Sequence, residues 1–187
     1  GGPHGADRPG GNALADCQVF GQIAGNSAAD WASVHPLPGK QSALDWAEER
    51  QQAVLTRVNE QNSGEQEKAQ LAKELWLHCG LYRDEAGLQS VLSSCEAARA
   101  SLVKQGARCP GEVLELGALT RLGQAVALSA LAREESRGTH YRADFPVKNL
   151  PEWECQHLIG WEDSELALSR RKLELPPEVA ALRSELE

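Results

Sequence analysis

The sequence predicts a mainly α-helical protein: an antiparallel bundle of about four helices, with one helix before it and a short β-hairpin after it. Apolar residues recur at helical spacing in four successive stretches between residues 41 and 135. The connections between these stretches are short, which favours neighbouring helices that run antiparallel. Beyond residue 138 the helical period ends and short extended segments follow.

The helix before the bundle is expected over residues 12–33, with Asn12 as its N-cap. Some of its apolar residues need cover from another part of the protein, namely Val19, Phe20 and Ile23. A segment rich in Pro and Gly, residues 35–39, then breaks the helix and marks a boundary.

The four bundle helices are expected over residues 41–60, 64–79, 84–105 and 111–135. No strand is expected between residues 64 and 105. The fourth helix follows Pro110, and proline is favoured in a first helical turn. This helix is apolar almost all round, which predicts that it is the central and most buried member. The hairpin strands are expected near residues 153–159 and 166–175.

Charge and cysteine content exclude several classes of partner and site. The chain of 187 residues carries a net charge of −8, so nucleic acid and anionic lipid are poor candidate partners. Its apolar runs are shorter than the ~20 residues of a membrane helix, so no direct membrane span is expected. The five cysteines form no C-x-x-C pair, which indicates reduced thiols in a cytoplasmic protein and no iron–sulfur or zinc site within this chain.

The chain is expected to be a piece of a longer protein, or one subunit of a split one. It contains no methionine and opens in the middle of what looks like a functional motif. It also lacks the strand, G-x-G-x-x-G turn and helix with which a dinucleotide-binding domain holds a pyrophosphate.

The first motif is the segment of residues 4–14, HGADRPGGNAL. Its arginine, Arg8, lies among glycines and is followed at once by a helix start. A helix N-terminus offers unpaired N–H groups, and a guanidinium binds a carboxylate through two parallel hydrogen bonds, so the segment suits anion binding. It resembles the HGANRLGGNSL segment of the succinate dehydrogenase, fumarate reductase and L-aspartate oxidase flavoproteins.

Two further blocks resemble the same family. Residues 133–146, REESRGTHYRADFP, resemble its ESRG-x-H-x-R-x-D signature, and residues 80–88 resemble a G-I-x-R connection. The dense alternating charge of the first block favours a network of ion pairs and caps over a catalytic role. Such a network would pin the last bundle helix onto a flavin domain. His140 is a chemically possible proton carrier, but its spacing indicates no substrate.

The resemblance implies the chemistry of the first motif. Arg8 would be a catalytic residue that binds one carboxylate of a small dicarboxylate beside the flavin. Residues Gly11, Asn12, Ala13 and Leu14 would bind FAD, because the first helical turn points its N–H groups at the isoalloxazine. Hydride would then pass between the flavin and succinate, fumarate or aspartate. Departures from the family pattern at Asp7, Pro9 and Ala13 leave the substrate open.

The resemblance also implies partners and boundaries. The partners are an upstream FAD-binding domain or subunit, a dicarboxylate substrate and an iron–sulfur subunit, the last placing the protein at the inner face of a membrane. Residues 1–35 would be the tail of the FAD-binding domain, 36–138 the helical bundle and 139–187 a C-terminal extended tail. The alternative is a redox-inactive helical interaction or assembly module that descends from such a flavoprotein.

Overall fold

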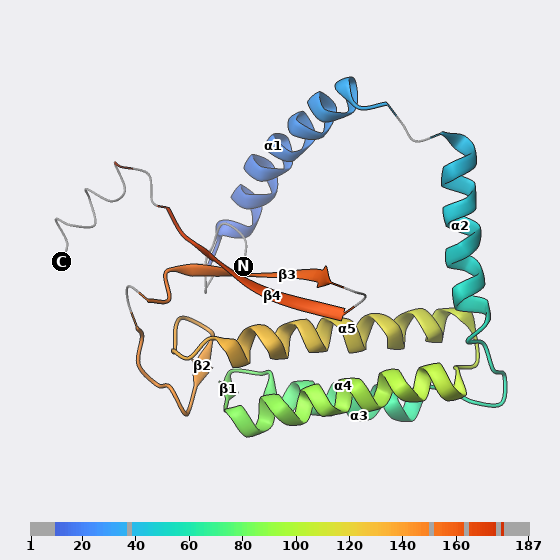
Figure 1. Ribbon diagram of the computed structural model, residues 1–187. Helices are drawn as coiled ribbons and strands as arrows, with labels where there is room; N and C mark the ends of the chain where they lie inside the picture. The colour runs from blue at the N-terminus through green and yellow to red at the C-terminus, as the bar shows by residue number, and fades with distance from the viewer. Residues whose placement is uncertain (1–9, 37–38, 150–151, 163–164, 175–176, 178–187) are drawn as a thin grey trace.

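The computed structural model describes residues 10–36, 39–149, 152–162, 165–174 and 177. These residues are mainly helical and end in a pair of antiparallel strands, which confirms the predicted fold class (Figure 1). The helices are α1 (Asn12–Val34), α2 (Lys40–Leu55), α3 (Glu65–His78), α4 (Glu85–Gln105) and α5 (Pro110–Ala132). The strands are β1 (Tyr82–Arg83), β2 (Tyr141–Arg142), β3 (Cys155–Glu162) and β4 (Glu165–Lys172).

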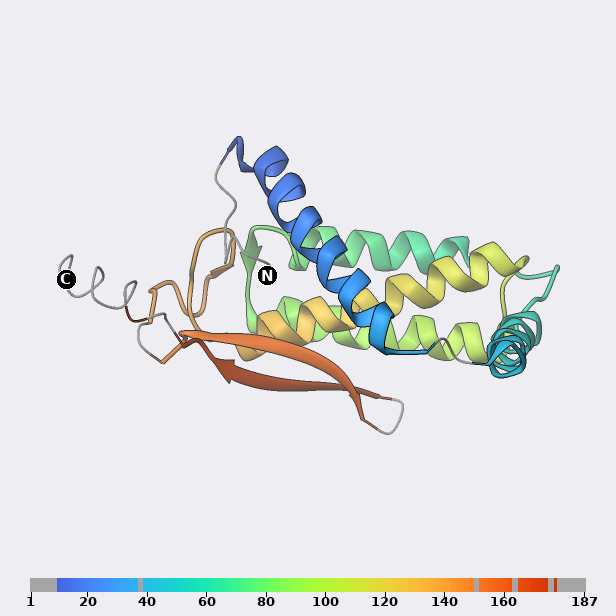
Figure 2. The same ribbon diagram turned by 90° about the horizontal axis from the view of Figure 1, so that it is seen from above.

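The bundle consists of α3, α4 and α5, which lie side by side with short connections (Figures 1 and 2). Their facing apolar side chains form one core, whose most buried members are Leu71, Leu88, Val91, Cys95, Leu116 and Ala127. Gly123 lets α4 and α5 approach closely, because an added Cβ would lie 3.0 Å from the Cys95 Sγ atom. As predicted, α5 is central: it contacts α2, α3, α4 and the hairpin. The expectation that it is also the most buried helix is wrong, because α4 buries as many residues and Leu114 and Leu122 of α5 are 58% and 66% exposed.

Helix α2, expected over residues 41–60 as the first bundle helix, ends at Leu55, stands at one end of the bundle and buries none of its residues (Figure 1). Its polar sequence offers no continuous apolar stripe, so only its last turn reaches the core, through Val54. The chain after it is fixed to the α4–α5 connection by two backbone bonds, Asn59 N to Ala107 O (2.7 Å) and Ala107 N to Arg57 O (2.9 Å). Gly106 has a φ of 73°, and a Cβ there would lie 2.3 Å from the Arg57 carbonyl oxygen.

Helix α1 rises away from the bundle, and none of its residues is buried (Figures 1 and 2). The three residues expected to need cover, Val19, Phe20 and Ile23, are 54%, 47% and 53% exposed. A Cβ added at Gly21 or Gly25 would meet nothing within 4 Å. The apolar and small-residue faces of this helix are therefore uncovered within the described part of the chain. None of the described helices is long and apolar enough to cross a membrane.

The strands correct one expectation. Residues 82–83 form β1, a two-residue strand inside the region where no strand was expected, and pair in parallel with β2 through Tyr82–Tyr141 and Arg83–Arg142. A contact between segments almost 60 residues apart creates this pairing, so local periodicity carries no sign of it. The predicted hairpin is confirmed as β3 and β4, which pack along α5 (Figure 1).

Candidate functional site

The start of α1 is the predicted flavin-facing turn. Gly11, with a left-handed φ of 86°, is the N-cap, and no side chain caps the helix, which corrects the expectation that Asn12 is the cap. Residues Asn12, Ala13 and Leu14 form the exposed first turn, so their N–H groups and the positive end of the helix dipole face outward. Arg8, predicted to bind the substrate carboxylate, lies outside the described residues.

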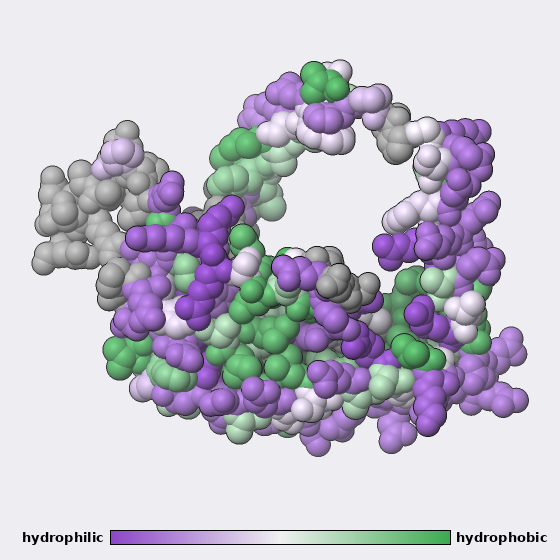
Figure 3. Space-filling model, in the orientation of Figure 1, coloured by the Kyte–Doolittle hydropathy of each residue, from purple (hydrophilic) through white to green (hydrophobic). Residues whose placement is uncertain are grey.

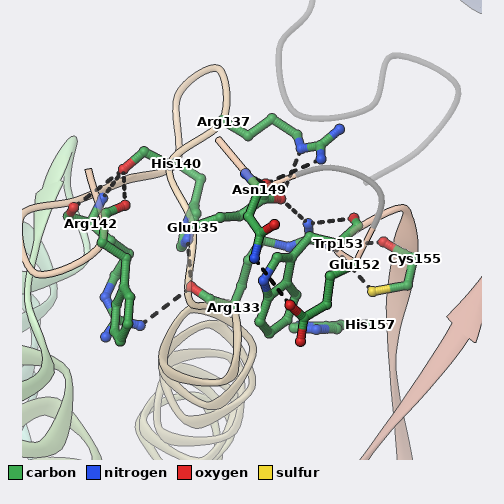
Figure 4. A network of polar contacts seen from close by, with 12 residues as sticks. Arg133, Glu135, Arg137, His140, Arg142, Asn149, Glu152, Trp153, Cys155 and His157 are labelled. Carbon is green, nitrogen blue, oxygen red and sulfur yellow. Dashed lines mark hydrogen bonds and ion pairs between the residues drawn. The ribbon is translucent and has the colours of Figure 1, made fainter. Parts of the chain in front are cut away.

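A second polar site lies where α5 ends, and Glu135 is its centre (Figure 4). The Glu135 side chain is fully buried and accepts hydrogen bonds from Arg133 Nη1 (2.6 Å), Arg137 Nε (2.9 Å) and the Asn149 backbone N–H (3.0 Å). Burial raises the pKa of Glu135, but the bonds from Arg137, Asn149 and Arg133 outweigh it and hold the pKa below 4.5. Glu135 is therefore a paired, buried carboxylate.

Arg133 connects this centre to the C-terminal hairpin. Its guanidinium donates to the carbonyl oxygens of Trp153 (3.1 Å) and Cys155 (2.6 Å). The Trp153 ring is buried, and the Arg170 guanidinium from β4 lies 4.1 Å above it. His157 donates from Nδ1 to the Ser129 carbonyl of α5, while its Nε2 is buried without a hydrogen-bond partner in the described structure.

Arg142 joins the ends of two helices. Its buried guanidinium donates to the carbonyl oxygens of Ala130 (2.8 Å) and Leu131 (2.9 Å), which closes the C-terminus of α5. Its Nε and Nη2 atoms donate to the two carboxylate oxygens of Asp144, both at 2.7 Å. Asp144 in turn accepts from the Glu85 N–H at the start of α4. The Arg142 bonds, together with that helix-end bond, hold the pKa of Asp144 below its usual range.

His140 connects this loop to the α3–α4 turn. Its Nδ1 atom lies 2.7 Å from Arg83 Nη1, and its Nε2 atom lies 3.2 Å from the Arg133 carbonyl oxygen. A guanidinium can only donate, so Nδ1 accepts and Nε2 carries the single proton. Burial, and then the nearby Arg83, Arg133 and Arg142, lower the pKa of His140 below 6.5 against the opposing carbonyl bond. The ring is therefore neutral, with both nitrogens already engaged.

This second site has a structural role. The predicted network of ion pairs and caps is confirmed, and it joins α4, α5, the α3–α4 turn and the hairpin. His140 has no free nitrogen to move a proton. Among the described residues, no group of three His, Cys, Asp or Glu side chains could hold a metal ion.

Arg83 is the member of this site that sequence analysis missed. It lies within the 80–88 segment, whose resemblance to the family was the available signal, but nothing in that segment indicated its partner. The pairing with His140 spans 57 residues, so only the folded chain brings the two side chains together.

Comparison with known proteins identifies the family of the chain. Residues 68–183 match the family model described as the fumarate reductase flavoprotein C-term. The chain is 31% identical to the fumarate reductase flavoprotein subunit of Haemophilus influenzae, over 79% of this chain and 26% of that protein. It is 32% identical to L-aspartate oxidase of Mycobacterium bovis, over 81% of this chain and 25% of that protein.

A solved structure agrees with these relatives. The chain resembles the Sdh1 complex of Mycobacterium smegmatis in its apo form, with a TM-score of 0.77 and 25% identity, covering 94% of this chain and 32% of that one. The chain thus spans less than a third of the length of the relatives it matches. It belongs to the succinate dehydrogenase, fumarate reductase and L-aspartate oxidase flavoprotein family and corresponds to the C-terminal part of its members.

Proposed function

We propose that this chain is the C-terminal portion of an FAD-dependent oxidoreductase that transfers a hydride between a small dicarboxylate and flavin. The observation that carries the proposal is the HGADRPGGNAL segment, which leads directly into the exposed N-terminus of α1. Family membership supports it, because relatives over most of this chain bear the names fumarate reductase and L-aspartate oxidase.

In this proposal Arg8 binds one substrate carboxylate. A guanidinium keeps its charge at every working pH and matches a carboxylate with two parallel donors, which a lysine cannot do. The N–H groups of residues Asn12, Ala13 and Leu14, after the turn at Gly11, face the flavin. When bound, FAD accepts or donates the hydride, and the positive end of the α1 dipole stabilises negative charge on the reduced ring by about 0.3–2 kcal/mol.

An FAD-binding domain outside these residues is the proposed cover of α1. The helix exposes Val19, Phe20 and Ile23 on a fold whose relatives are about three times longer or more. Residues 1–35 are accordingly assigned to that domain, 36–138 to the helical bundle and 139–187 to the C-terminal tail. An iron–sulfur subunit that exchanges electrons with the flavin is the proposed partner, with the assembly at the cytoplasmic face of a membrane.

The test is the whole protein that contains this chain. We expect the purified protein to show a flavin absorbance spectrum and to turn over succinate, fumarate or aspartate with a redox dye. An intact mass equal to this chain alone, without flavin absorbance and without turnover, would favour the redox-inactive helical module instead.

A further inference from the structure

An open groove of about 1040 Å³ runs between α5, the β3–β4 hairpin and the loop after α5. Its lining contains basic and imidazole side chains but no Asp or Glu among the described residues: Arg83, Arg133, Arg137, Arg171, His140 and His157. This concentration of guanidinium groups contrasts with the net charge of −8 on the chain. The groove is therefore a local positive site on an acidic protein.

The contacts within the site leave that positive charge only partly balanced. Glu135 is shared by Arg133 and Arg137, and Asp144 neutralises Arg142. Arg83 donates to the Gly80 carbonyl (2.8 Å) and to neutral His140 (2.7 Å). Among the described residues no carboxylate lies within ion-pair distance of Arg83.

Leaving a half-buried guanidinium without a carboxylate is costly. Burial accordingly lowers the pKa of Arg83. Its Nε and Nη1 atoms are engaged, while Nη2 has no hydrogen-bond partner in the described structure. A guanidinium with one donor group still open at the edge of a groove is suited to accept a carboxylate from outside.

The groove floor indicates what carries that carboxylate. It is apolar and exposed, with Leu122 66%, Val126 46% and Leu158 39% exposed. Figure 3 shows apolar side chains gathered on this face of the bundle, below the arch made by α1 and α2. An apolar floor beside a basic wall matches a protein segment that carries an acidic residue next to apolar ones. The relatives extend to about three times the length of this chain or more, so such a segment is available within the same protein.

We propose that the groove seats an acidic segment of the remaining part of this flavoprotein, with one Asp or Glu carboxylate bound to Arg83 and adjacent apolar side chains covering Leu122 and Val126. The inference rests on the proposed function only in assuming that the chain is the C-terminal portion of a longer flavoprotein. The bond would place a charged clamp between the bundle and the rest of the protein, at the point where His140 fixes Arg83 to the end of α5.

The experiment is zero-length carbodiimide coupling in the whole protein with the Arg83→Lys variant, followed by peptide mass spectrometry. Carbodiimide joins an amine to a carboxylate only when the two are in contact. The matched control is Arg99→Lys, because Arg99 already pairs with Glu165 at 3.0 Å within this chain and must give that cross-link. Flavin content is recorded separately from its absorbance, so loss of cofactor and loss of the contact are distinguished.

The expected result is an amide between position 83 and an Asp or Glu outside residues 1–187, with the control coupled to Glu165. Coupling of position 83 only to residues within 1–187, to another subunit, or to nothing while the control couples, would overturn the proposal. If Arg83→Lys does not fold, Arg171→Lys on the exposed rim of the same groove replaces it, with the same outcomes. A protein without flavin that still gives the cross-link would contradict the proposed function and leave this inference intact.

Discussion

Helix α1 and the loop of residues 133–149 both depart from the rule that apolar residues are buried and charged residues are exposed, and they do so in opposite ways. α1 carries Val19, Phe20 and Ile23 and buries none of its residues. The loop is dense in charge, yet Glu135 is 0% and Arg142 1% exposed. The difference lies in where the partners are: each buried charge finds its counter-charge within this chain, whereas the apolar face of α1 finds no cover in the described residues.

This difference separates two kinds of residue. Changes in the loop should act on the stability of the bundle, because its hydrogen bonds close within the chain. Changes in the first motif and α1 should act on flavin chemistry or on assembly and leave the bundle alone. Hydrogen exchange of the α5 amides measures the first effect even in a multidomain protein, since it reports opening of one region.

The largest effect is expected for Glu135→Gln. The amide would remove the charge that balances Arg133 and Arg137 and turn one acceptor into a donor facing donors. Breaking a buried ion pair by removing one partner costs about 3–5 kcal/mol. Hydrogen exchange at the C-terminal end of α5 should therefore accelerate by more than about a hundredfold, since each 1.4 kcal/mol is a factor of ten.

The control for Glu135 is Glu165→Gln. Glu165 pairs with Arg99 at the surface, with the Arg99 and Glu165 side chains 44% and 59% exposed, and such pairs contribute about 0–1 kcal/mol. If the two variants had equal effects on α5, the loop would be an ordinary surface network and the contrast with α1 would fail.

The second effect is catalytic and concerns Arg8→Ala. We expect dicarboxylate turnover by the whole protein to fall by about 10²-fold or more, with flavin absorbance and α5 exchange unchanged. Arg8→Lys should recover little activity, because a point charge does not reproduce two parallel donors. Steady-state kinetics beside the flavin spectrum measure this. Near-normal turnover would make Arg8 a loop residue, and loss of flavin would assign it a structural role.

The sequence predicted the helices within a few residues but not the contacts that assemble the loop. Helical periodicity is local, so α3, α4 and α5 follow from it. The charge pattern predicted a network without its pairs, since Arg133 reaches Trp153 and Cys155 carbonyls about 20 residues away. Arg83 and β1 depend on pairing with residues 140–142, a tertiary contact that no window of neighbouring residues contains.

A third, smaller effect is a pH dependence of the loop. The pKa of His140 in the folded protein lies below its ordinary value of 6.5, as does that of His157, because burial and then nearby arginines disfavour the charged ring. Their stabilising contribution is complete above pH 6.5. It is lost as the pH falls below 6.5, because the unfolded state then takes up protons that the folded state rejects. The lowered pKa values of Glu135 and Asp144 change the stability only below about pH 4.5, the ordinary glutamate pKa.

The measurement is the pH dependence of α5 exchange between pH 5 and 7, after correction for the intrinsic rate. One histidine contributes a slope of at most about 1.4 kcal/mol per pH unit. In His140→Gln the amide can accept from Arg83 and donate to the Arg133 carbonyl, so the variant should fold and lose part of the slope. An unchanged slope would mean that the pKa of His140 is the same in the folded and the unfolded protein, contrary to its burial and its hydrogen bonds.

The smallest effect on the bundle is expected for Phe20→Ser in α1. Phe20 is 47% exposed and α1 buries nothing, so α5 exchange should shift by no more than about 0.5 kcal/mol, the range of ordinary surface substitutions. Leu71→Ala is the contrasting variant, because Leu71 is 1% exposed in the core and such truncations cost about 2–5 kcal/mol. In the whole protein Phe20→Ser should still weaken flavin retention, because a polar side chain would enter the interface that we assign to the flavin domain. A Phe20→Ser variant that retained its flavin and turned over substrate normally would contradict the assignment of α1 to the flavin-domain interface. The contrast between α1 and the loop would then have no functional basis.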